Sequence, residues 1–401
     1  MDGGLNGFGQ AASVWQDAEA LARVEPVGIG LGFLSDPAPL IERACSLGVD
    51  EVIVRLEWAR LEPRRGAFDR RALARCAELL EAIRSSGLAV GISLSDGTAP
   101  AWFGGEGWLT PAAPETFARY AAAVGSALGD QIASVFTLEE PALWAMAGWM
   151  SASAPPFRRL ALPDALAVLD NMMAGHLLAM TILKDAIPAV EVTVVPSNDL
   201  AFPLEREILG LGMSTVAAPL VKRWSPGRAK AMASTTSLGG DVLSLGRDSV
   251  RWTGGAVGLL TRRMLSEETV FDAPSLAGVL GAKASEIAPG PFTVAYRHRC
   301  ATVDERGRRR NLSGHLREHE LIALADAVVA VRRNGGRIHR VILGDLTDRW
   351  RWGTYGARSG IFGVDRTRGP QGFRLLETDA SGVNAAAAIR SAIAALRDGK
   401  V

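Results

Sequence analysis

Short apolar runs alternate along the chain with longer segments in which apolar residues recur every three or four positions. The short runs are typical of buried β-strands, and the longer segments have the period of amphipathic helices. Eight strands are predicted, over residues 27–33, 51–57, 89–95, 133–138, 191–196, 256–260, 291–296 and 340–346. Helices are predicted over residues 72–87, 114–128, 165–185, 318–334 and 382–397.

This order of elements predicts the fold class. Strands that alternate with helices pair in parallel through right-handed crossovers. Eight such units in series indicate an α/β protein of the (β/α)8 TIM-barrel class, with its chemistry at the C-terminal ends of the strands. We expect one domain over residues 1–401. Within it, residues 1–24 form an extension with a helix at 11–23, and residues 200–250, rich in Pro, Gly, Ser and Arg, form an irregular insertion.

Composition and net charge limit the classes of function that the chain could have. The chain is 48% hydrophobic and 22% charged, and its formal net charge of +1 gives no field that would recruit nucleic acid or a membrane. Three distant cysteines (Cys45, Cys76 and Cys300) favour a reducing compartment over disulfides. The N-terminus has no signal-peptide pattern, and no charge-free run of 18 apolar residues occurs. We therefore expect a cytoplasmic protein that acts on a small molecule without a metal or cofactor.

Four segments at predicted strand ends carry a family pattern. They read E-W-A-R-L-E-P at 57–63, L-S-D-G-T-A-P-A-W at 94–102, F-T-L-E-E-P at 136–141 and L-T-D-R-W-R-W at 346–352, the last followed by G-I-F-G-V-D at 360–365. In this order and spacing the chain resembles the retaining β-glycosidases of glycoside hydrolase family 1. The resemblance implies a TIM barrel with a sugar site at the strand ends.

The resemblance also assigns a catalytic acid. Retaining glycosidases use two carboxyl groups about 5–5.5 Å apart, one as acid/base and the other as nucleophile. Glu140 stands where the family keeps its acid/base, whose pKa must be raised by burial and by the second carboxylate. A surface glutamate in a loop is the simpler alternative, but an apolar strand that ends Glu-Glu-Pro favours a function.

The nucleophile is missing. The family has it at the end of strand seven, where this chain reads P-F-T-V-A-Y-R-H-R-C-A-T at 291–302. Counting from the start of that segment places Tyr296 at the position, and counting back from its end places Arg297 there. No carboxylate occurs between Glu286 and Asp304.

Other sugar-binding positions also differ. Asp96 replaces a histidine, Glu139 replaces the asparagine before the acid/base, and Arg351 replaces the glutamate that grips two sugar hydroxyls. Asp348 and Trp352, which flank Arg351, match the family's motif in this segment. We expect Asp96, Glu139, Glu140, Tyr296 and Arg351 to converge on one pocket, and Arg297 and Arg351 would suit a carboxylate or phosphate on the ligand.

Three functions fit this pattern. The first is an enzyme that uses Glu140 as general acid/base without the covalent intermediate, in an atypical hydrolysis, elimination or cyclisation, with Glu139 and Tyr296 as further catalytic residues. The second is a ligand-binding pseudoenzyme, and the third is a β-glycosidase whose nucleophile moved to Glu139 or Asp96. The tryptophans Trp102, Trp108, Trp144 and Trp149 could stack on a ring-shaped ligand or pack in the core.

Overall fold

The structure is a computed structural model, and it describes part of the chain. The described residues are 11–17, 37–95, 99–139, 141–150, 152, 154–195, 241–245, 292–296, 301–303, 309–311, 314–347, 360–365, 374–379 and 382–398. Two compact units emerge. The first comprises Met1–Val54, Ala82–Ala89 and Ser266–Val401, and the second comprises Arg55–Glu81 and Val90–Leu265.

The first unit is built on parallel strands. β1 (Ala11–Asp17) pairs with β10 (Ile338–Thr347), and β10 pairs on its other side with β7 (Phe292–Tyr296). The short strand β11 (Gly360–Phe362) also runs parallel to β10. Most of β2 (Glu51–Arg55) belongs to this unit, and the buried Arg340 of β10 pairs with the buried Glu51 of β2 at 3.1 Å. Buried charges are tolerated when they are paired in this way.

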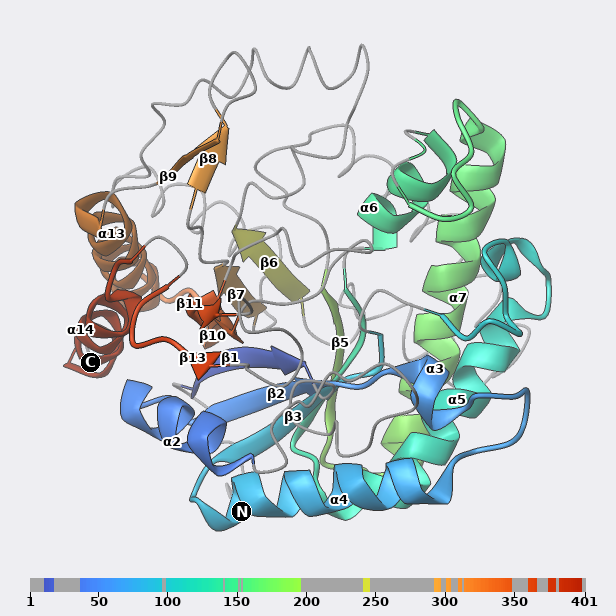
Figure 1. The fold of residues 1–401 in the computed structure, drawn as a ribbon, viewed down its shortest axis with the longest axis horizontal. Helices are drawn as coiled ribbons and strands as arrows, with labels where there is room; N and C mark the ends of the chain where they lie inside the picture. The colour runs from blue at the N-terminus through green and yellow to red at the C-terminus, as the bar shows by residue number, and fades with distance from the viewer. Residues whose placement is uncertain are drawn as a thin grey trace. The chain divides into compact units, whose positions relative to one another are not determined.

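Helices and two small hairpins complete the first unit. The helices are α2 (Ala38–Leu47), α13 (Gly314–Arg333) and α14 (Ala385–Asp398), and the last two pack side by side (Figure 1). The antiparallel pairs are β8 (Ala301–Val303) with β9 (Arg309–Asn311), and β12 (Val364–Asp365) with β13 (Arg374–Leu375).

The second unit is also built on parallel strands. β4 (Ser134–Glu139) lies between β3 (Ala89–Ser93) and β5 (Glu191–Val195), and β6 (Asp241–Leu245) follows later in the chain. Its longer helices, α5 (Ala113–Leu128) and α7 (Leu162–Ala186), pack side by side (Figure 1). The shorter helical segments are α3 (Trp58–Leu61), η1 (Gly107–Leu109), η2 (Gly129–Gln131), α6 (Pro141–Ala145) and η3 (Met146–Met150), which is a π-helical turn.

Helix α7 is the one helix among the described residues that is long and apolar enough to cross a membrane. Most of its apolar stretch is buried, and it packs on α5 and on strands β4 and β5. A buried helix in a large core has the same composition as a membrane span, because both are surrounded by apolar groups. The contacts of α7 are those of a core helix.

Two predicted elements need correction. Residues 11–17 were expected in a helix but form strand β1, because pairing with the buried strand β10 outweighs a weak helical preference. The irregular insertion at 200–250 contains strand β6 at 241–245, which an apolar alternation of only five residues did not signal. The predicted strands 27–33 and 256–260 lie outside the described residues. A single domain stays a prediction.

Helix α4 (Arg70–Ser85) shows why the helices could be predicted from the sequence. Asp69 caps it by accepting hydrogen bonds from the backbone nitrogens of Arg71 and Ala72 at 2.8 and 3.0 Å. Ala72, Cys76 and Leu80 recur at four-residue spacing and are buried. Burial raises the pKa of the Cys76 thiol from 9.0 to about 11, although nearby Arg75 and Arg60 oppose that shift.

The raised pKa of Cys76 predicts an alkaline loss of stability. Above pH 9 the thiol ionises in the unfolded chain but stays neutral in the folded one, so this contribution is complete below pH 9 and is lost as pH rises towards about 11. The maximum loss is roughly 3 kcal/mol, from 1.36 kcal/mol per pKa unit. Urea unfolding at pH 8 and 10.5 should show that Cys76→Val is less sensitive to pH than the parent. Equal sensitivity would contradict the prediction.

Candidate active site at the end of strand β4

The end of β4 is shaped by a β-bulge. Phe136 of β4 stands opposite Thr193 of β5, and Glu139 stands opposite Val195. Three steps on β4 therefore match two on β5, so β4 contains one extra residue in this stretch. Such a bulge breaks the two-residue alternation of side chains and turns the following residue to a new direction. Glu139 is the first paired residue after the bulge.

Two neighbouring elements hold the bulge. The Thr137 hydroxyl donates to the backbone carbonyl of Thr193 at 3.2 Å and lies 2.6 Å from Nδ1 of His176, a fully buried residue of α7. Thr137 thus ties β4 to both β5 and α7.

Beyond the bulge, Glu139 forms a buried ion pair with Arg55. Nε of Arg55 lies 2.6 Å from Oε1 of Glu139, and the two side chains are 1% and 7% exposed. Arg55 is the last residue of β2, so the pair joins the C-terminal ends of two strands. At such low exposure the ion pair offsets part of the cost of burying the two charges.

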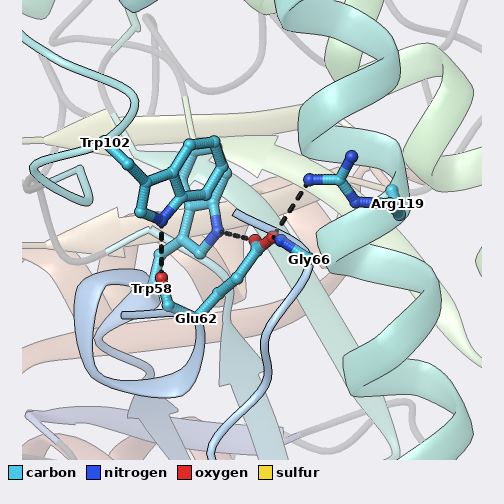
Figure 2. Close-up of polar contacts among 5 residues, drawn as sticks. All are labelled: Trp58, Glu62, Gly66, Trp102 and Arg119. Atoms are coloured by element: carbon cyan, nitrogen blue, oxygen red, sulfur yellow. Dashed lines mark hydrogen bonds and ion pairs between the residues drawn. The ribbon is translucent and has the colours of Figure 1, made fainter. Parts of the chain in front are cut away.

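A second buried carboxylate organises the loops after β2 and β3 (Figure 2). Glu62 has no exposed side-chain surface, and it accepts hydrogen bonds from Nε1 of Trp58 at 2.8 Å, the backbone nitrogen of Gly66 at 2.6 Å and a guanidinium nitrogen of Arg119 at 3.0 Å. Its backbone carbonyl accepts a hydrogen bond from Nε1 of Trp102 at 2.7 Å. Glu62 therefore connects α3, the loop that follows it, Trp102 and α5.

The tryptophans near this carboxylate belong to an aromatic cluster. Trp58 stacks on Tyr120 with ring centroids 5.0 Å apart, and Trp102 meets Trp58 edge to face at 5.8 Å. Trp108 contacts the rings of Phe103 and Phe117 and is buried. Trp149 is 1% exposed. Core packing is thus the correct alternative for Trp108 and Trp149, and a ligand-stacking role for these two is wrong.

Loss of the Glu62 carboxylate should destabilise the protein. In Glu62→Leu, the buried indole nitrogen of Trp58 would lose its acceptor, and the bonds to Gly66 and Arg119 would be lost with it. An unsatisfied buried donor costs about 1–3 kcal/mol. We expect the free energy of unfolding in urea to fall by roughly 2–4 kcal/mol. Glu62→Gln is the control, because its amide oxygen keeps one acceptor and the loss should be smaller. Equal losses in the two variants would contradict this account.

Of the predicted site residues, the structure describes one side chain, that of Glu139. Tyr296 is placed by its backbone as the last residue of β7. The other predicted residues, which are Asp96, Glu140, Arg297, Asp348, Arg351 and Trp352, lie outside the described residues, so their convergence on one pocket stays a prediction. The sequence also placed Arg55, at the end of its strand, among the basic residues expected to pair with the extra carboxylates, and the structure shows it paired with Glu139. Sequence reasoning missed His176, for which a single histidine in an apolar helix was the available signal.

Comparison with known proteins agrees with the strand-end motifs. The family model described as "Glycosyl hydrolase family 1" matches residues 39–212, a range that includes Arg55, Glu62 and Glu139. The chain is glycosyl hydrolase family 1-like. The matched range ends before β7, where the family's nucleophile was expected. No curated protein matches the chain.

Solved structures show the fold of this family 1-like chain. The β-glucosidase of Thermotoga maritima in complex with deoxynojirimycin superposes with a TM-score of 0.67 at 16% identity, over 98% of each chain. The same enzyme in complex with castanospermine gives 0.66 at 14% identity, over 97% of this chain and 98% of that one. Its complex with noeuromycin gives 0.65 at 15% identity, over 100% of both. The fold is therefore the (β/α)8 barrel predicted from the sequence, in agreement with the parallel strands of both units.

Proposed function

We propose that this protein is an atypical glycosidase-like enzyme in which Glu140 is the general acid/base and no covalent glycosyl-enzyme forms. The substrate is a glycoside or a similar small polar metabolite. The buried Arg55–Glu139 ion pair carries the proposal, because it anchors the residue directly before Glu140. A general acid must be held within hydrogen-bond reach of the leaving group, and a fixed strand end provides that restraint.

The same ion pair favours a positioning role for Glu139. A nucleophile must reach the anomeric carbon, whereas the Glu139 side chain is 7% exposed and its Oε1 atom is engaged by Arg55. We propose that Glu139 and Arg55 together hold Glu140, and that a water molecule or a group of the substrate takes the place of the missing carboxylate nucleophile. Tyr296 would act as nucleophile only in the alternative mechanism, in which a covalent intermediate forms on its phenolic oxygen. Arg297 and Arg351, with Asp96, Asp348 and Trp352, are proposed for substrate binding.

A substrate panel tests the proposal. Nitrophenyl β-glucoside should be turned over far more slowly than the enzyme median kcat of about 10 s⁻¹, because one member of the usual carboxylate pair is absent. The same sugar bearing a carboxylate or a phosphate should be a better substrate if the arginines bind the anion. A rate near the median on the neutral glucoside would contradict the missing nucleophile and favour Glu139 in that role.

Binding without turnover is the competing outcome. If ligands from the panel raise the melting temperature but none is consumed, even at high enzyme concentration, the protein is a ligand-binding pseudoenzyme. A ligand that binds only the folded state stabilises it by an amount that grows with the ratio of its concentration to Kd. Measuring both turnover and melting temperature on one panel therefore separates the enzyme from the pseudoenzyme.

A further inference from the structure

Large hydrophobic side chains are exposed at one place in the second unit. Five such side chains are exposed among the described residues, and four of them lie between positions 157 and 166: Phe157, Leu160, Leu162 and Leu166. Phe157 is 62% exposed and Leu160 is 82% exposed. Leu162 and Leu166 are one helical turn apart at the start of α7, so they lie on the same face of that helix. We call these four residues the apolar patch.

The backbone presents the apolar patch in a defined conformation. Phe157 and Leu160 have φ angles of 59° and 51°, in the left-handed region that bulky residues rarely adopt. The backbone nitrogens of Arg158, Leu160 and Ala161 donate to three consecutive carbonyls of η3, at 2.8, 3.1 and 2.9 Å. These bonds hold the segment 157–161 against η3, so the strained residues are kept in place by the surrounding structure.

Charges of both signs surround the apolar patch. Arg158 and Arg159 are exposed within it, and Arg158 forms an ion pair with the exposed Glu106. Asp164, in the first turn of α7, lies close enough to Arg158 to act on its charge. Two arginines and two acids give a formal charge of zero. An anionic lipid surface attracts a basic face, and this rim is not basic.

We propose that the apolar patch is a self-association surface through which two copies of this chain form a symmetric dimer. In a two-fold interface a surface meets its own copy, so it must be complementary to itself. An apolar centre meets an apolar centre, and a rim with equal numbers of both charges can place the arginines of one copy opposite the acids of the other. An apolar core with a polar rim is the usual arrangement of protein interfaces.

Sedimentation velocity from about 1 to 200 µM, a range that detects micromolar to millimolar association, tests the dimer. The full chain should sediment as a growing fraction of dimer as concentration rises. Leu160→Asp should remain monomeric across the range at an unchanged melting temperature, because an exposed substitution has little effect on folding. Leu160→Gly is the second variant. It removes the side chain and suits the positive φ, so it should also be monomeric without loss of stability.

Ile322→Asp provides the matched control, because Ile322 is 41% exposed but lies on α13, outside the apolar patch. It should dimerise as the parent does.

A charge exchange tests the rim of the apolar patch. Arg159→Asp and Asp164→Arg should each weaken the dimer at least several-fold, and the double variant should recover part of the loss. A parent that stays monomeric at all concentrations, or a dimer that survives in Leu160→Asp, would overturn the proposal. So would flotation of the monomer with vesicles of phosphatidylcholine and phosphatidylserine that is lost in Leu160→Asp.

Discussion

Glu140→Gln is expected to lower kcat by about 10²–10⁴ on the best substrate of the panel, the range measured for general acid–base catalysis. The effect should depend on the leaving group. A nitrophenolate leaves with little help from a proton, whereas an alkoxide must be protonated as it leaves. The loss should therefore be larger on an alkyl glycoside than on the nitrophenyl glycoside of the same sugar, when kcat is measured for both at saturation.

The control for this prediction is Glu81→Gln, an exposed glutamate of helix α4 that lies on no strand end. It should retain the parent kcat on both substrates. If Glu140→Gln retains the parent rate, the proposed acid is wrong. If its loss is the same for good and poor leaving groups, Glu140 contributes to binding or to an earlier step and does not protonate the leaving group.

Arg55→Met is expected to lower the free energy of unfolding by about 3–5 kcal/mol, the cost of breaking a buried ion pair by removing one partner. The Glu139 carboxylate is 7% exposed and would lose its contact with the guanidinium. Urea unfolding at pH 7 measures this loss.

Two further variants separate the buried pair from charge effects in general. Arg55→Met combined with Glu139→Leu removes both charges, and it should recover most of the lost stability, because apolar replacements of a buried pair are often neutral. Arg397→Met removes a half-exposed arginine that pairs with Asp50, and it should cost about 1 kcal/mol or less. A loss in Arg55→Met as small as that in Arg397→Met would contradict the burial argument.

Hydrophobic periodicity was sufficient to predict most of the helices and strands. The predicted strands at 51–57, 89–95, 133–138, 191–196, 291–296 and 340–346 are confirmed as β2, β3, β4, β5, β7 and β10. The predicted helices are confirmed as α4, α5, α7, α13 and α14, with boundaries that differ by up to four residues. Predictions of long periodic segments are reliable because the burial of one face determines the type of element. The exact ends of a helix depend on local caps instead. Strand β1 was wrongly predicted as a helix because its parallel partner β10 is more than 300 residues away in the sequence.

The sequence by itself determined the barrel class and the strand-end motifs, because both follow from local periodicity and from residue order. It also determined that residues 287–303 contain no carboxylate. Only the tertiary structure showed which partners surround the buried carboxylates Glu139 and Glu62. A β-bulge precedes Glu139, Arg55 pairs with it across 84 positions, and Glu62 is enclosed by donors from three segments. The physical reason is that a carboxylate's role depends on its burial and its partners, which are set by segments distant in sequence.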